Sequence, residues 1–146
     1  MYEYRCTIRR VVDGDTVDVD INLGFDVVLA NQRIRLYGID TPESRTRDLV
    51  EKKYGLFAKN YVLSMLPVGS LQTLETVKDD AKGKYGRILG KFTVRDPKTE
   101  VECHIHDLMV REYIGVRYFG QSKDDVEAEH LENRRLLHLP SDPYDG

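Results

Sequence analysis

Three stretches near the start of the chain have the composition of β-strands, at residues 4–12, 17–22 and 27–36. The pattern is clearest in the second stretch, where apolar residues take every second position, as expected for a strand with one buried face. A D-G-D-T segment at residues 13–16 separates the first two stretches, and its Asp-Gly pair predicts a turn. We therefore expect an antiparallel meander of three strands.

From position 54 the apolar residues recur every three or four positions, and this spacing predicts an amphipathic helix over residues 54–66. The charged segment that precedes it, residues 44–53, is predicted to be a loop. The rest of the chain predicts strands at 70–77, 88–95 and 100–103, a polar loop at 78–87, and helices at about 105–113 and 123–137.

These elements predict a mainly β fold with three helices, in which five strands form an OB-type barrel with a helix inserted after the third strand. We expect one domain over residues 1–146, because a chain of 146 residues can bury a substantial core. Pro140 and Pro143 end regular structure, so residues 138–146 are predicted to be a flexible tail.

The composition is ordinary for a globular protein, with 40% hydrophobic and 32% charged residues. The net charge of −3 is uneven, since residues 124–146 carry a net −5 and the preceding residues a net +2. This distribution permits an anionic substrate without requiring one. The two cysteines, Cys6 and Cys103, do not form a disulfide framework.

The first residues contain no apolar segment ahead of their charges, so no signal peptide is predicted. We expect a cytoplasmic protein, or a secreted one if a leader has been removed. No apolar run is long enough to cross a bilayer, and a monomer is the default expectation.

An eleven-residue segment from Arg33 to Glu43, R-I-R-L-Y-G-I-D-T-P-E, concentrates the candidate chemistry. Its alternation predicts a strand that buries one face and projects arginines from the other. The strand is followed by a stiff turn that carries Asp40 and Glu43, because Pro42 restricts Thr41 to extended backbone. Two carboxylates beside a guanidinium are an unusual combination to maintain for stability alone.

Three separated motifs now stand in a fixed order: D-G-D-T at residues 13–16, R-x-x-x-x-D-T-P-E at 35–43, and K-Y-G-R at 84–87. In this order the sequence resembles the staphylococcal nuclease (thermonuclease) family, with motifs matching between about residues 12 and 118. Each motif alone has an ordinary structural interpretation as a hairpin turn, a solvated strand face or a polar loop. Their joint occurrence favours a nuclease.

The resemblance implies a calcium-dependent phosphodiesterase that hydrolyses DNA, RNA or both at the 5′ P–O bond and leaves 3′-phosphate ends. It implies that Asp15, Asp40 and the Thr41 carbonyl bind Ca²⁺, which prefers six to eight oxygen ligands. It also implies that Glu43 holds or deprotonates the attacking water. The residues expected to contact the substrate are Arg35, Lys84, Tyr85, Arg87 and Tyr118, with the two arginines on the phosphate and Tyr118 on a base.

The physical chemistry of phosphodiester hydrolysis agrees with these roles. A cation and two guanidiniums offset the negative charge that builds on the phosphate oxygens, and the planar fork of Arg35 or Arg87 meets two oxygens at once. An arginine is a poor proton donor, so the group that protonates the leaving oxygen is not identified. If the site forms, Arg35 and Arg87 are expected to face the cation across a gap of phosphate size, with Arg33 on the surface.

Two alternatives remain open. The first is a non-catalytic OB-fold module that binds nucleic acid or protein, although such a module has no need of a complete metal site. The second is a hydrolase of smaller phosphate esters. A zinc site at Cys103, His104 and His106 is disfavoured, because the C-H-x-H pattern lacks a fourth ligand.

Overall fold

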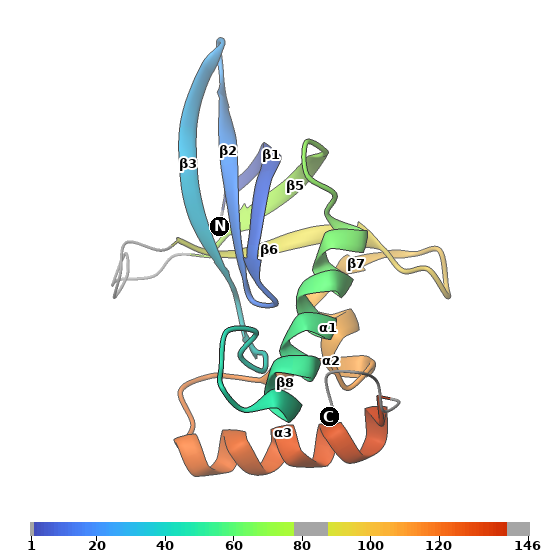
Figure 1. Ribbon diagram of the computed structural model, residues 1–146. Coiled ribbons are helices and arrows are strands. Elements are labelled where there is room, and N and C mark those ends of the chain that lie inside the picture. The colour runs from blue at the N-terminus through green and yellow to red at the C-terminus, as the bar shows by residue number, and fades with distance from the viewer. Residues whose placement is uncertain (1, 78–87, 140–146) are drawn as a thin grey trace.

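The computed structural model describes residues 2–77 and 88–139 of the chain, and three helices and eight strands lie in these residues (Figure 1). The strands are β1 (Tyr2–Asp13), β2 (Thr16–Gly24), β3 (Val27–Leu36), β4 (Ile39–Asp40), β5 (Leu71–Thr76), β6 (Ile88–Arg95), β7 (Glu102–His104) and β8 (Val116–Arg117). The helices are α1 (Leu49–Met65), α2 (Ile105–Arg111) and α3 (Lys123–Leu137).

Five strands close into a ring in the order β3-β2-β1-β5-β6, and β6 returns to pair with β3. All neighbours in the ring are antiparallel except β3 and β6, which run parallel over three residue pairs from Ile34–Ile88 to Leu36–Gly90. We call this pairing the β3–β6 seam. The closed ring of five strands with three helices confirms the predicted mainly β fold and is consistent with an OB-type barrel.

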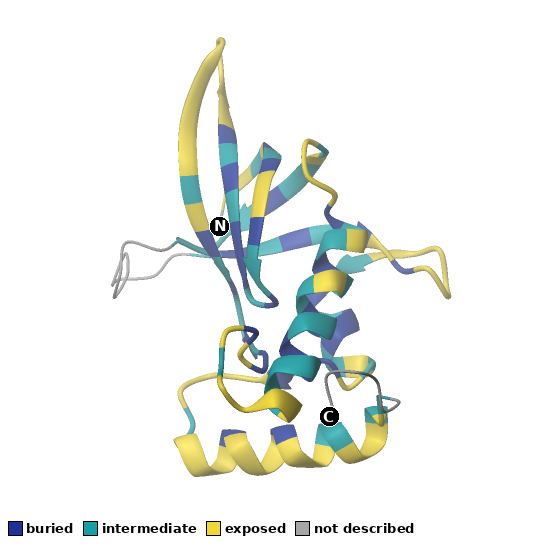
Figure 2. Cartoon of the chain, viewed as in Figure 1, coloured by how far each residue is buried: buried dark blue, intermediate teal, exposed yellow. Residues whose placement is uncertain are grey.

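The core residues lie on the strands of the ring and on the first two helices, where Figure 2 shows buried segments in dark blue. Ile8, Val17, Ile34, Leu74 and Phe92 supply fully buried side chains from five different strands. Burying each such side chain stabilises the fold by about 1.5–3 kcal/mol. The first two helices contribute further buried members of the core cluster, which are Ala58, Val62, Ile105, Leu108 and Met109.

The helix α1 begins five residues earlier than predicted, so the prediction of a loop over residues 44–53 is wrong at its end. Asp48 caps the helix, because its carboxylate accepts hydrogen bonds from the backbone N–H groups of Val50 and Glu51 at 3.0 and 3.1 Å. Leu49 and Val50 are exposed, which is why the first turn shows no apolar periodicity.

Two further differences concern short elements. The strands β4 and β8, which pair with each other at Ile39–Arg117 and Asp40–Val116, are too short to produce an alternating pattern. The helix α2 ends at Arg111 rather than at Tyr113, whose φ of +62° is incompatible with an α-helix. The predicted bounds of β3, β6 and α3 are confirmed.

The hairpin of β2 and β3 projects well beyond the ring (Figure 1). Its turn at residues 24–26 has positive φ throughout, and its apolar residues are exposed, namely Leu23, Phe25, Val27, Val28 and Leu29. Arg33, lower on β3, lies on the surface as predicted and makes a bidentate contact with Asp18.

Candidate active site

A cleft of about 1100 Å³ opens at the end of the ring where β3 stops. Most of its lining comes from the β1–β2 turn, the end of β3, β4 with the loop that follows, residues 118–121 and one face of α3, and Glu51 of α1 and Leu89 of β6 also contribute. Among the predicted site residues, Asp15, Arg35, Asp40, Thr41, Glu43 and Tyr118 all lie on this cleft.

Asp15 is held by two neighbours at the tip of the β1–β2 turn. Its Oδ1 accepts a hydrogen bond from the Thr16 hydroxyl at 2.9 Å, and its Oδ2 accepts a long one from the Thr41 N–H at 3.4 Å. The preceding Gly14 makes this approach possible, because a Cβ there would lie 2.7 Å from the Ala58 Cβ and 2.9 Å from the Thr41 hydroxyl oxygen. The D-G-D-T turn can therefore pack against both α1 and the D-T-P-E loop.

Arg35 lies between the two predicted metal ligands. Its Nη2 is 3.7 Å from Asp15 Oδ2 and 3.7 Å from Asp40 Oδ1, and its Nη1 donates a hydrogen bond to the Leu36 carbonyl at 2.8 Å. The expectation that Arg35 faces the carboxylates across a phosphate-sized gap is therefore wrong for this structure. Carboxylates of like charge repel each other, and a guanidinium in contact with both offsets that repulsion.

His130 contacts Asp40 from the opposite side, and sequence reasoning missed it. Its Nε2 donates a hydrogen bond to Asp40 Oδ2 at 2.7 Å, and its side chain is only 7% exposed. Val126 and His130 are the buried residues of α3. Their spacing of four residues was the available signal, because it places the histidine on the inward face of a mostly polar helix.

Glu43 lies in the loop between β4 and α1, and its side chain is exposed to the cleft. Partial burial raises the pKa of its carboxyl group, and the negative charges of neighbouring carboxylates raise it further, in order Asp13, Asp15, Glu51 and Asp40. A raised pKa brings a carboxylate closer to the basicity needed to accept a proton from water at neutral pH.

Exposed aromatic side chains form one rim of the cleft. Tyr118 is fixed through its backbone, since its N–H donates to the Gly38 carbonyl at 2.9 Å. Phe119, which the sequence analysis did not single out, is 67% exposed and meets the edge of the Tyr37 ring at a centroid distance of 5.8 Å. Exposed aromatic rings at a cleft can stack on nucleobases.

Lys84, Tyr85 and Arg87 lie outside the described residues, so their predicted contacts stay predictions. Ile88, at the start of β6, pairs with Ile34 in the β3–β6 seam. Of the predicted tail, residues 140–146 also lie outside the described residues. Leu139 donates its backbone N–H to the Tyr54 hydroxyl at 3.2 Å.

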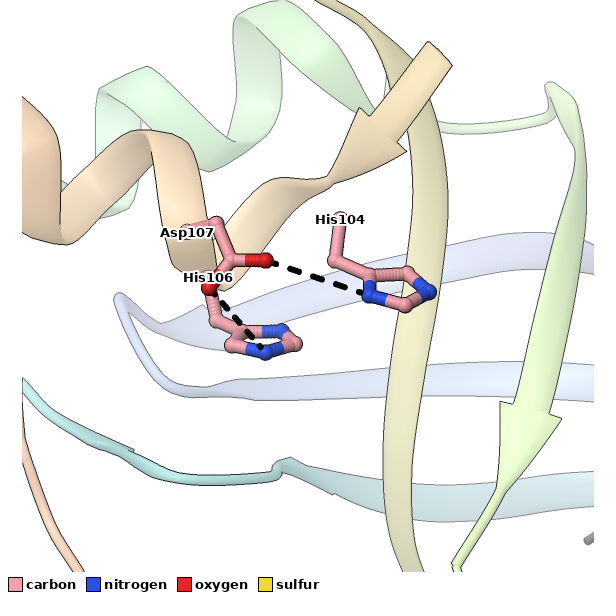
Figure 3. Close-up of side chains that lie close together, drawn as sticks. All are labelled: His104, His106 and Asp107. Atoms are coloured by element: carbon pink, nitrogen blue, oxygen red, sulfur yellow. Dashed lines mark ion pairs between the residues drawn. The ribbon is translucent and has the colours of Figure 1, made fainter.

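A separate polar cluster lies at the start of α2, where His104, His106 and Asp107 come together (Figure 3). Asp107 is 4.0 Å from His104 Nδ1 and 3.7 Å from His106 Nε2, and it also contacts Arg117 Nη1 at 2.8 Å. Cys103 packs against the core instead. The C-H-x-H segment therefore does not bring its three side chains to one point, and the carboxylate that joins the histidines is already paired with an arginine.

The donor set of the cleft has a clear chemical character. Asp15, Asp40 and Thr41 offer only oxygen atoms, which suits a hard divalent cation, and the adjacent guanidinium of Arg35 suits an anionic oxygen. Within residues 2–77 and 88–139, no helix has the length and apolar character needed to cross a membrane.

Comparison with known proteins gives a consistent result. The sequence profile of the family described as "Staphylococcal nuclease homologue" matches residues 33–135. The chain is 34% identical over 128 residues to the SPbeta prophage-derived endonuclease YokF of Bacillus subtilis, covering 84% of this chain and 40% of that protein. It is 33% identical over 96 residues to the thermonuclease of Staphylococcus intermedius, covering 65% of this chain and 52% of that protein.

A further relative matches along almost the whole chain. The micrococcal nuclease of Shigella flexneri is 30% identical over 148 residues, which cover 97% of this chain and 76% of that protein. Several relatives are much longer than the matched region, since the chain spans 40% of YokF and 10% of the endonuclease YhcR of Bacillus subtilis.

Proposed function

The chain belongs to the staphylococcal nuclease family, and on this premise we propose that it is a nuclease that hydrolyses phosphodiester bonds in DNA, RNA or both. The observation that carries the proposal is the meeting of Asp15, Asp40 and Arg35 at one end of the cleft, with Arg35 Nη2 at 3.7 Å from each carboxylate. Two segments that are distant in sequence, the β1–β2 turn and residues 35–40, meet to build this arrangement, as a site for an anionic substrate and a cation requires.

We propose Ca²⁺ as the cofactor, held by Asp15, Asp40 and Thr41. The oxygen-only donor set fits a hard cation. The proposed atom of Thr41 is its backbone carbonyl oxygen, and the Thr41 N–H donates a hydrogen bond to Asp15 Oδ2 at 3.4 Å, which keeps the two residues side by side. When bound, Ca²⁺ would supply a fixed positive charge that offsets the charge of the phosphodiester.

The side chains of the cleft would bind the phosphate and activate the attacking water. Arg35 would donate hydrogen bonds to the phosphate oxygens and stabilise the charge that develops on them. Glu43, whose pKa is raised by partial burial and by the surrounding carboxylates, would orient the attacking water and accept its proton. Attack at phosphorus would break the bond to the 5′ oxygen and leave 3′-phosphate and 5′-hydroxyl ends.

Three residues outside the described part of the chain belong to the same proposal. Arg87 would share the phosphate with Arg35, and Lys84 and Tyr85 would contact neighbouring phosphates. Tyr118, on the rim, would stack on a base, which favours a substrate with exposed bases.

The direct test is incubation of the protein with plasmid DNA, single-stranded DNA and RNA in Ca²⁺, in Mg²⁺ and in a chelator, from neutral to alkaline pH. We expect degradation in Ca²⁺ that the chelator abolishes. The products should accept a 5′ label from polynucleotide kinase without prior dephosphorylation, and should resist extension by a polymerase until a phosphatase removes the 3′-phosphate.

Arg35→Ala and Glu43→Gln test the roles proposed for these two side chains, and each should lower kcat by about 10²–10³-fold. Binding of nucleic acid without degradation in any of these conditions would instead support a non-catalytic module. Products with 5′-phosphate ends would contradict the proposed bond cleavage.

A further inference from the structure

We propose that His130 is a positioning residue of this site, which orients Asp40 for the cation and couples cation binding to the docking of α3. This proposal rests on the proposed function, because it takes Asp40 to be a calcium ligand. No motif of the sequence points to His130, and its role follows from where α3 places it.

The contact between His130 and Asp40 is short and shielded. The Nε2 atom lies 2.7 Å from Asp40 Oδ2, and the imidazole is 7% exposed. Burying an imidazole is costly unless it makes a hydrogen bond. Among the described residues, Asp40 is the hydrogen-bond partner of this ring, since the Nδ1 atom is buried without one.

The two oxygens of Asp40 have different surroundings. Oδ2 is occupied by His130, whereas Oδ1 points toward the side of the cleft where Asp15 lies, at 3.7 Å from the Nη2 atom that also contacts Asp15. A hydrogen bond to one carboxylate oxygen fixes the rotation of the group and directs the other oxygen to the metal. His130 therefore selects Oδ1 as the atom that Asp40 offers to a cation.

The same contact attaches α3 to the site. The helix has a polar sequence in which Val126 and His130 are buried and Leu137 packs half-buried against the core, so apolar burial makes a limited contribution to its docking. Its other anchors include a hydrogen bond from Asn133 to the Gly115 carbonyl at 3.1 Å and one from the Tyr54 hydroxyl to the Arg134 carbonyl at 3.3 Å. Arg134 also lies 3.8 Å from Glu51 in an ion pair with α1. The link to Asp40 is the shortest of these polar contacts and the one that attaches α3 directly to the proposed cation site.

Coupling follows from this arrangement. A cation that fixes Asp40 in place presents a preformed partner to His130, so it favours the docked helix. By thermodynamic reciprocity, a docked helix must favour the cation by the same factor. The C-terminal helix would thus act on metal affinity although it supplies no ligand to the metal.

The test uses three variants of the whole chain: His130→Ala, which removes the contact, His130→Gln, whose side-chain amide can still donate to Asp40, and Leu131→Ala. Leu131 is 51% exposed on the same helix and is the matched control for truncation. Calcium affinity is measured by titration calorimetry without nucleic acid, and docking of α3 by hydrogen exchange of its amides with and without Ca²⁺.

We expect His130→Ala to weaken calcium binding by about 10- to 100-fold and to abolish the extra protection of α3 amides that calcium confers. His130→Gln should recover most of both, and Leu131→Ala should match the wild type. If His130→Ala acted only by loosening α3 in general, Leu131→Ala would show similar losses, and His130→Gln would not restore calcium affinity or amide protection.

Unchanged calcium affinity in a folded His130→Ala variant would overturn the proposal, as would equal losses in Leu131→Ala. A visible absorption band of bound Co²⁺ that both His130→Ala and His130→Gln lose at saturating metal, and that Leu131→Ala keeps, would make His130 a ligand and not a positioning residue. If the wild type degrades nucleic acid but binds no Ca²⁺, this proposal and the choice of cofactor fail together while the nuclease activity stands.

Discussion

The backbone of Gly55 in α1 lies directly against the backbone of Glu43. A Cβ built on Gly55 would overlap the carbonyl group of Glu43 and approach the N atom of Ser44 at 2.6 Å. The loop that carries Glu43 therefore rests on a helix surface from which a side chain is missing, and the position of Glu43 depends on that contact.

We predict that Gly55→Ala lowers both stability and activity. At an ordinary helix position this change stabilises by roughly 0.5–1 kcal/mol, but here the added methyl must displace the loop, at a cost of about 1–3 kcal/mol. The measurements are Tm and kcat, with Asn60→Ala, at an exposed position of the same helix, as the control. A Gly55→Ala variant with a raised Tm and normal kcat would show that the loop does not depend on this glycine.

A second prediction separates the two consequences of removing Arg35. Because Arg35 Nη2 contacts both Asp15 and Asp40, it competes with a cation for the same oxygens. Arg35→Met should therefore lower kcat by about 10²–10³-fold yet bind Ca²⁺ more tightly, by a factor of about 2–30, because two competing ion pairs of about 0.2–1 kcal/mol each are lost. Calorimetric titration of the variant checks this, and weaker calcium binding would mean that Arg35 organises the site and does not compete for it.

The aromatic rim gives a prediction about substrates. If bases stack on Tyr118 and Phe119, alanine at either position should raise KM for single-stranded DNA, by an amount that corresponds to about 1–3 kcal/mol per stacked base. The KM for a stable duplex, whose bases are already stacked, should change much less. Steady-state kinetics on both substrates with each variant makes the comparison, and Tyr113→Ala, an exposed tyrosine that is not among the residues lining the cleft, is the control.

A fourth prediction concerns stability in acid. Arg111 donates to both carboxylate oxygens of Asp96, and these hydrogen bonds, with one from the Lys98 N–H, hold the pKa of Asp96 well below its usual range. The folded protein thus keeps Asp96 ionised where the unfolded chain has begun to bind a proton. This contribution to stability is fully present above about pH 4 and is lost as the pH falls from there toward the lowered pKa of the folded state.

Asp96→Asn should therefore lower the free energy of unfolding at neutral pH, and its difference from the wild type should shrink as the pH falls below about 4. Urea unfolding at a series of pH values measures this. A difference that stays constant through the acid range would show that the Asp96–Arg111 contact contributes no linked stability.

Much of the fold could be predicted because periodicity reflects burial. The bounds of β3 and α3 are correct, and in β3 the alternation of Ile34 and Leu36 with the arginines matches the burial of these two side chains. The first turn of α1 could not be predicted, because its apolar residues are exposed and its start depends on the Asp48 cap. The pairing of β4 with β8 brings together residues about 77 positions apart, which no local pattern reports.

The candidate site was likewise predictable in some respects and not in others. Motif order was enough to select Asp15, Arg35, Asp40, Thr41 and Glu43, and the structure brings all five to one cleft. It could not reveal that Arg35 contacts both carboxylates, because a motif carries no information about side-chain conformation. Nor could it reveal His130, whose partner is ninety residues away and on another element.

The β3–β6 seam also bears on how the molecule reaches its active form. It is the parallel closure of the ring, it spans three residue pairs, and it joins segments more than fifty residues apart. Forming contacts between such distant segments costs loop-closure entropy, so these contacts tend to form late in folding. Arg35 is one of the three β3 residues in this seam, so we expect a partly folded chain to have its hairpins before Arg35, the proposed phosphate-binding arginine, is in place. An unfinished molecule would then be harmless to nucleic acid, and activity would itself report that the ring has closed.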